Sequence, residues 1–79
     1  MKKIQDSDMF LKGFGNNVKK YREKLSLTQE QLSELTSIDY KYIQRIEYGT
    51  KNVTLKTVFK LCQALKISSK DLLDFNDTK

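Results

Sequence analysis

Residues 28–49 read TQEQLSELTSIDYKYIQRIEYG, and this stretch decides the fold. It begins with Thr28, and Gln31 follows three residues later. This spacing is typical of a capping box, in which the hydroxyl and the amide satisfy free backbone groups at the start of a helix. We therefore expect a short helix from Thr28 to Leu35. Leu32 and Leu35 are expected to face inward, because residues three positions apart lie on one side of a helix.

The second half of the stretch predicts another helix after a tight turn. Asp39 is suited to cap its start, and Gly49 supplies the left-handed residue that ends it. Ile43 and Ile46 are expected to face the core. Two short helices joined by a tight turn form a helix-turn-helix, here over residues 28–48. The second helix of such a pair is the one that enters a DNA major groove.

Helical spacing continues on both sides of this stretch. Before it, an apolar stripe predicts a first helix, which we expect to begin between residues 7 and 16 because two glycines weaken its start. After it, Thr54 caps a fourth helix, and Ser68 with Asp71 forms a second capping box that starts a short fifth helix. The apolar stripes are Leu11, Phe14, Val18, Tyr21 and Leu25 in the first helix, Val58, Leu61, Cys62 and Leu65 in the fourth, and Leu72 and Leu73 in the fifth.

The composition suits a folded helical protein. The chain has 79 residues, no proline and three glycines, with 38% hydrophobic and 32% charged residues. We expect one all-α domain over residues 1–79, a compact five-helix bundle with residues 1–10 as an N-terminal extension. The formal net charge of +5 fits a polyanionic partner, although many small proteins are basic without binding nucleic acid.

The same composition argues against an enzyme or a metal protein. Histidine, the commonest general base and metal ligand, is absent. Cys62 is the only cysteine, and we expect a buried core thiol rather than a nucleophile. We therefore expect no catalytic residue, metal, cofactor or small-molecule ligand. No apolar run reaches the roughly 20 residues that span a bilayer, and the residues from Met1 to Asp6 lack the apolar stretch of a secretory signal, so a cytoplasmic location is expected.

The outer side of the helix after Asp39 carries side chains suited to reading bases. With Ile43 and Ile46 directed inward, four polar side chains fall on the outer side or at the N-terminal end. Arginine and lysine donate to guanine O6 and N7, and glutamine pairs with adenine N6 and N7. The expected base-reading residues are Tyr40, Lys41, Gln44 and Arg45. Their spacing alone is equally compatible with a solvated surface.

Flanking residues are suited to the DNA backbone. Thr28 and Gln29 lie at the start of a helix, where free amides can meet a phosphate. Tyr42 has two interpretations: its hydroxyl contacts a phosphate, which we favour, or its ring fills the surface between helices. The loop that follows supplies a cation and two polar groups for backbone contacts. These loop residues are Thr50, Lys51 and Asn52.

The stretch from Val18 to Leu73 resembles the phage-repressor-like (Cro/repressor type, also called XRE) helix-turn-helix family. The matching segments are residues 27–32 (LTQEQL), 42–49 (YIQRIEYG), 54–55 (TL) and 61–65 (LCQAL). Within the family, residues 39–43 (DYKYI) and 49–55 (GTKNVTL) are most similar to restriction–modification controller proteins, which are short and dimeric. Tyr40 and Tyr48 depart from that pattern, because those proteins commonly carry arginine there.

The resemblance implies a fold and a function. The fold is the compact five-helix bundle of phage-repressor-like DNA-binding proteins. The function is a sequence-specific regulator of transcription that binds double-stranded DNA as a homodimer on a palindromic or pseudopalindromic operator, with control of a restriction–modification operon as one role. The resemblance also implies that Arg22 pairs with Glu47 in a partly buried structural bridge. It further implies a DNA-facing set of Gln29, Lys41, Gln44 and Arg45, with Tyr40 at the rim.

Two other functions stay open. The same fold can serve as a protein-interaction module, such as an antitoxin or a coactivator, or bind DNA through charge without sequence preference. For the homodimer, Leu73 and Phe75 are the expected interface, because a one- or two-turn helix cannot hide every apolar residue near the C-terminus. The alternatives are that Phe75 folds back over its own domain, or that residues 9–11 (MFL) form the interface.

Overall fold

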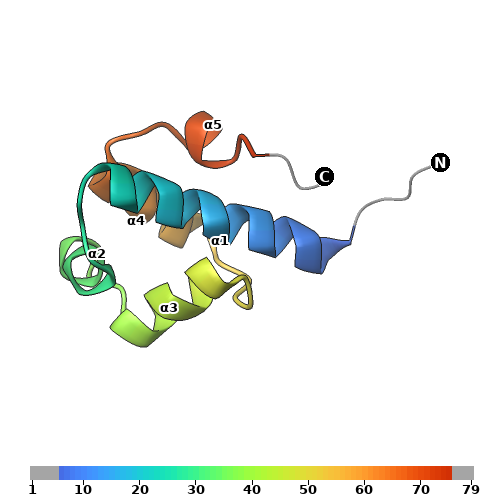
Figure 1. The fold of residues 1–79 in the computed structure, drawn as a ribbon, viewed down its shortest axis with the longest axis horizontal. Coiled ribbons are helices and arrows are strands. Elements are labelled where there is room, and N and C mark those ends of the chain that lie inside the picture. Colours follow the sequence, from blue (N-terminus) through green and yellow to red (C-terminus); the bar gives the residue numbers. More distant parts are fainter. Residues whose placement is uncertain (1–5, 76–79) are drawn as a thin grey trace.

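The computed structural model describes residues 6–75, and within that range the chain forms five helices and no strand (Figure 1). The helices are α1 (Ser7–Lys24), α2 (Gln29–Thr36), α3 (Tyr40–Tyr48), α4 (Leu55–Leu65) and α5 (Ser69–Leu72). The all-α, five-helix prediction is confirmed. Because α1 begins at Ser7, residues 7–10 of the expected N-terminal extension are helical, and residues 1–5 of it lie outside the described range.

The long helix α1 is the scaffold of the bundle. It packs against α3, α4 and α5, and α2 packs against α3 and α4. In Figure 1, α1 runs along the long axis of the molecule, with α3 along one side and α5 along the other. Helix α3 therefore lies at the edge of the fold, where it packs against α1 and α2.

The predicted helix starts are confirmed at Thr28, Asp39, Thr54 and Ser68. Thr28 has both bonds of its capping box: its N–H donates to Gln31 Oε1 at 2.8 Å, and its hydroxyl oxygen accepts from the Gln31 N–H at 3.0 Å. Asp39, Thr54 and Ser68 each accept a backbone N–H from the first turn of their helix. Ser68 receives only the N–H of Asp71, at 3.1 Å, so half of that predicted capping box forms.

The core follows the predicted stripes with three exceptions, one of which is Leu73, 44% exposed directly after the end of α5. Every helix contributes buried apolar side chains, and those covered completely are Val18, Leu32, Ile43, Leu61 and Leu72. Leu35, predicted to face inward, is 60% exposed. Leu25, the last residue of the first stripe, is 40% exposed because it ends α1 where the chain turns away.

Thr36 takes the place predicted for Leu35. Residues three and four positions after Leu32 both lie near its side of the helix, and the fold buries the second. The Thr36 hydroxyl donates to Leu32 O at 2.8 Å and accepts from the Ile38 N–H at 3.2 Å, so it is satisfied inside the core. The prediction for Leu35 was therefore wrong by one residue.

Gly15 allows α1 and α3 to approach at backbone distance. A Cβ atom at this position would collide with the carbonyl oxygen of Ile46 and lie 2.8 Å from that of Glu47. Any larger residue would push α3 away from α1. At the end of α3, Gly49 has φ +90°, the left-handed conformation that the sequence predicted there.

Candidate nucleic-acid interface

The outer face of α3 presents together the four residues predicted to read bases. Beneath them, Ile43 and Ile46 are 0% and 1% exposed and attach the helix to the core. The outer side chains are those of Tyr40, Lys41, Gln44 and Arg45, all of them exposed. Because the buried residues fix the rotation of α3, the polar residues share one side of the molecule.

Two of these outer side chains are bonded to each other. Gln44 lies one turn after Tyr40, and its Nε2 donates to Tyr40 Oη at 3.2 Å. This spacing of four residues was visible in the sequence, and it places the two side chains next to each other on a helix surface.

A basic hollow borders this face at the loop after α3. Lys41, Arg45 and Lys51 line it together with Tyr42 and Asp39. The Lys51 ammonium lies 5.2 Å from the centroid of the Tyr42 ring. Three cationic side chains and one carboxylate line the hollow, and this excess of positive charge suits an anion better than a cation.

Tyr42 and the residues of the loop after α3 differ in their exposure to solvent. The Tyr42 ring is half-buried and packs against the core, which both interpretations of this residue allow. Thr50 and Asn52 are exposed, and the Thr50 hydroxyl donates weakly to Arg45 O at 3.4 Å. The loop therefore lies beside the outer face of α3, with polar groups open to solvent.

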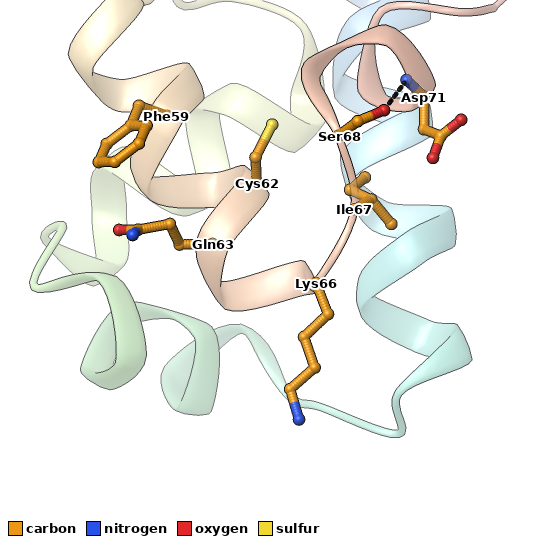
Figure 2. A pocket seen from close by; sticks show the side chains of 7 residues that line it. All are labelled: Phe59, Cys62, Gln63, Lys66, Ile67, Ser68 and Asp71. Atoms are coloured by element: carbon orange, nitrogen blue, oxygen red, sulfur yellow. Dashed lines mark hydrogen bonds between the residues drawn. The ribbon is translucent and has the colours of Figure 1, made fainter.

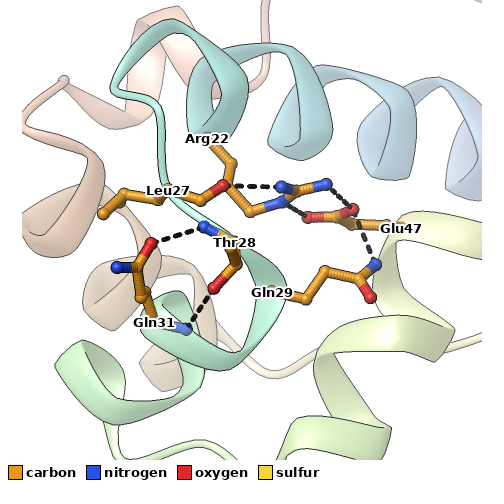
Figure 3. A network of polar contacts seen from close by, with 6 residues as sticks. All are labelled: Arg22, Leu27, Thr28, Gln29, Gln31 and Glu47. Carbon is orange, nitrogen blue, oxygen red and sulfur yellow. Dashed lines mark hydrogen bonds and ion pairs between the residues drawn. The ribbon is translucent and has the colours of Figure 1, made fainter.

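A buried network ties α3 to the start of α2 (Figure 3). Arg22 Nε donates to Glu47 Oε2 at 2.7 Å, and Arg22 Nη2 donates to Glu47 Oε1 at 2.9 Å. The remaining Nη1 donates to Leu27 O at 2.7 Å. The two side chains are only 10% and 4% exposed, so the predicted bridge between Arg22 and Glu47 is confirmed. Its hydrogen bond to Glu47 raises the pKa of the Arg22 guanidinium, against the opposing effect of burial.

Gln29 belongs to the same network, which the sequence did not predict. Its Nε2 donates to Glu47 Oε1 at 3.0 Å, across eighteen positions of the chain. No local spacing could have revealed this contact. The side-chain amide of Gln29 is therefore partly used inside the protein, and the free backbone amides of the first turn of α2 are what this site offers to a phosphate. Thr28, whose hydroxyl oxygen accepts from Gln31, lies beside them.

Cys62 lines a hollow between α4 and α5 (Figure 2). This hollow shares no lining residue with the basic hollow beside α3. The hollow is also lined by Phe59, Ile67 and Asp71. Cys62 is 8% exposed, and burial followed by the nearby Asp71 charge raises the pKa of its thiol. The protonated thiol of a core residue fits this environment better than a nucleophile does.

Within residues 6–75, no group of three or more acidic, cysteine or histidine side chains is placed to hold a metal ion. No helix in the same range is long and apolar enough to cross a membrane.

The two alternative dimer surfaces of the sequence analysis meet in space. The rings of Phe10 and Phe75 lie 5.1 Å apart between centroids, and Phe75 also packs partly on its own core. Met9, Phe10 and Leu73 are each 44–45% exposed. We call these four residues the terminal apolar surface. Residues 9–11 and the residues after α5 therefore form one candidate interface and not two.

Comparison with known proteins gives consistent matches. Residues 18–72 match the helix-turn-helix protein family. The control protein C.BamHI of Bacillus amyloliquefaciens is 41% identical over 63 residues, which cover 78% of each chain. The control protein C.SmaI of Serratia marcescens is 42% identical over 57 residues, covering 72% of this chain and 68% of its own.

Solved structures agree with these matches. The restriction-modification controller protein C.AhdI from Aeromonas hydrophila superposes with a TM-score of 0.77 at 35% identity, covering 78% of this chain and 94% of its own. The hypothetical transcription factor NHTF from Neisseria has a TM-score of 0.81 at 21% identity, with 95% of this chain and 86% of its own covered, and supports the fold alone.

Proposed function

Because this chain belongs to the helix-turn-helix family, we propose that it is a regulator of transcription that binds double-stranded DNA in a sequence-specific manner through α3. The observation that carries the proposal is the outer face of α3, where polar and basic side chains lie directly over a buried anchoring face. The similarity to C.AhdI, a restriction-modification controller protein, supports control of a restriction–modification operon as its role. We propose a single DNA-binding domain without enzymatic activity that acts in the cytoplasm.

The residues of the interface divide into base-reading and backbone-binding groups. Lys41 and Arg45 are suited to donate to guanine O6 and N7, and Gln44 to pair with adenine. The basic hollow is suited to hold one phosphate, and the start of α2 another, since both offer donors to an anion. The proposed backbone contacts are Thr28, Gln29, Tyr42, Thr50, Lys51 and Asn52.

Base reading is tested by single substitutions on the outer face of α3. Genomic fragments bound by the purified protein would first be selected and sequenced to define the operator. Arg45→Ala and Gln44→Ala should each weaken binding by about 1–3 kcal/mol and relax preference at one base position. Lys19→Ala, on an exposed position of α1, is the control for lost charge. If both variants keep wild-type affinity and preference, α3 is not the reading helix.

We also propose that the working unit is a homodimer on a palindromic or pseudopalindromic operator. One helix-turn-helix reads only a few base pairs, which cannot mark a single site in a genome. A two-fold dimer places two reading helices about 34 Å apart, one turn of DNA, and so doubles the site. The proposed contact is the terminal apolar surface, including Leu73 and Phe75, because it exposes large apolar side chains that a second copy would cover.

Analytical ultracentrifugation at micromolar concentration tests this contact. Leu73→Asp should shift the protein to monomer, whereas Phe59→Asp, which changes a 61% exposed side chain on α4, should leave the dimer intact. Thermal melts would show that both variants fold. If Phe59→Asp alone breaks the dimer, the interface lies on α4. A folded wild type that is monomeric both free and on DNA would exclude the dimer.

A protein-interaction module is the second candidate. Leu55 and Phe59 lie one turn apart on α4 and are 85% and 61% exposed, which is unusual for side chains of this size. A partner protein that covers them would give the domain an antitoxin-like or coactivator-like role. This candidate is favoured over DNA reading if the genomic selection enriches no sequence.

A further inference from the structure

The hydrogen bond between Tyr40 and Gln44 bears on how the outer face of α3 selects a base. Tyr40 is the first residue of α3, and Gln44 Nε2 donates to its Oη at 3.2 Å. Both side chains belong to the four that the sequence predicts to read bases, so the bond joins two groups that would otherwise act separately.

The Tyr40 side chain is the more constrained partner. It is 38% exposed and lines a hollow together with Leu27, Thr28 and Gln29 at the start of α2. A tyrosine has two side-chain torsions, and here the Tyr40 residue borders the same hollow as Arg22 and Gln29 of the buried network. Gln44 is exposed, and its terminal amide can turn over freely unless a neighbour holds it.

Which way the amide faces decides what Gln44 reads. Its oxygen and nitrogen have nearly the same shape, but one accepts and the other donates. Adenine requires both at once: the glutamine oxygen accepts from N6–H, and a glutamine N–H donates to N7. A glutamine that turns freely also donates to guanine or thymine and accepts from cytosine, so it discriminates poorly.

Contact with DNA determines which side chain donates in the hydrogen bond between Tyr40 and Gln44. The Tyr40 hydroxyl can donate one hydrogen and accept another. DNA offers phosphate oxygens and base acceptors, so the hydroxyl hydrogen of Tyr40 points toward the DNA. The hydroxyl oxygen of Tyr40 is then left to accept from Gln44. The chain then runs from the Gln44 N–H through the Tyr40 hydroxyl to the DNA, and such chains strengthen each member. The second N–H and the oxygen of Gln44 remain free in the arrangement that adenine requires.

We propose that Tyr40 is a positioning residue that fixes the amide of Gln44 and thereby makes this position of α3 specific for adenine. The inference rests on the proposed function, since it concerns the same reading face.

The first arm of the test uses the free protein. The side-chain amide resonances of Gln44, assigned with Gln44→Ala, should shift in Tyr40→Phe. They should not shift in Tyr42→Phe, the matched variant, since the hydroxyl that accepts from Gln44 is that of Tyr40 and not that of Tyr42. Unchanged Gln44 resonances in Tyr40→Phe would overturn the inference without any reference to DNA.

The second arm measures binding to a set of single-base operator variants. The wild type should prefer adenine at one position by about 5- to 150-fold. Tyr40→Phe should reduce that preference by about 2- to 12-fold, the value of one hydrogen bond, and should have no such effect in the Gln44→Ala background. Tyr42→Phe should lower affinity for every variant evenly.

The outcomes separate the inference from the function on which it rests. If Tyr40→Phe leaves the preference unchanged, or alters it equally in the Gln44→Ala background, the inference fails and the proposed function stands. If the wild type shows no base preference at any position, the proposed function fails and the inference fails with it. Thermal melts of each variant confirm that the exposed substitutions leave the fold intact.

Discussion

Removal of the Glu47 carboxylate should destabilise the protein more than any surface substitution. Glu47→Ala eliminates three hydrogen bonds, two from Arg22 and one from Gln29. The guanidinium keeps a single bond, to Leu27 O, in a site where its side chain is only 10% exposed. Loss of one partner of a buried ion pair costs about 3–5 kcal/mol, because the other charge stays buried without compensation. We expect the lower value, about 3 kcal/mol, since one bond to the guanidinium survives.

A loss of this size is easily measured. For a domain of this length each kcal/mol lowers Tm by about 4–8 °C, so Glu47→Ala should melt about 12–24 °C below the wild type in circular dichroism. Glu34→Ala, at an exposed glutamate of α2, should melt as the wild type does and controls for lost charge. Combining Glu47→Ala with Arg22→Met should recover part of the loss, because no stranded cation remains. A Glu47→Ala protein that melts with the wild type, or a double variant no better than the single one, would refute this reasoning.

Four further predictions test other parts of the structure. Gly15→Ala should lower stability by about 1–3 kcal/mol in urea denaturation, because its Cβ would collide with Ile46 O; an unchanged midpoint would contradict the close approach of α1 and α3. Thr28→Ala should cost about 1 kcal/mol by removing a helix cap, and equal melting curves would show that the cap contributes nothing. Cys62 should react with a thiol reagent far more slowly in the native than in the unfolded protein, since burial raises the pKa of its thiol and keeps it protonated; equal rates would contradict its burial. Lys51→Ala should weaken binding to all DNA sequences and reduce the slope of log affinity against log salt by about 1, whereas an unchanged slope would remove Lys51 from the backbone contacts.

The parts of the fold that depend on neighbouring residues could be predicted from the sequence. Thr28, Asp39 and Gly49 act on backbone groups within a few positions, so their residue types were sufficient. The prediction for Leu35 failed because positions three and four after Leu32 are nearly equivalent, and apolar character favoured the wrong one. Thr36 can be buried only because its hydroxyl is satisfied locally, which a hydrophobic pattern does not record.

The candidate site also has one part that the sequence could predict and another that depends on tertiary packing. The exposed face of α3 was predictable, because the inward positions of Ile43 and Ile46 determine the outward ones. The bond from Gln29 to Glu47 was not, since it depends on how α2 and α3 pack. The pair Arg22 and Glu47 was anticipated only through the resemblance to a known family. Spacing within a helix therefore predicts which residues share a face, and tertiary packing decides which of them are free.

The close backbone contact at Gly15 also has a consequence for how new specificities arise. Within the nine residues of α3, the positions that attach the helix and the positions that face outward do not overlap. Because backbone meets backbone at Gly15, the distance between α1 and α3 is set by that contact and by the buried side chains of α3. Mutation can therefore explore the outer positions with little penalty in folding. A library randomised at those positions should yield mostly folded proteins, and closely related chains could acquire different operators while sharing one scaffold.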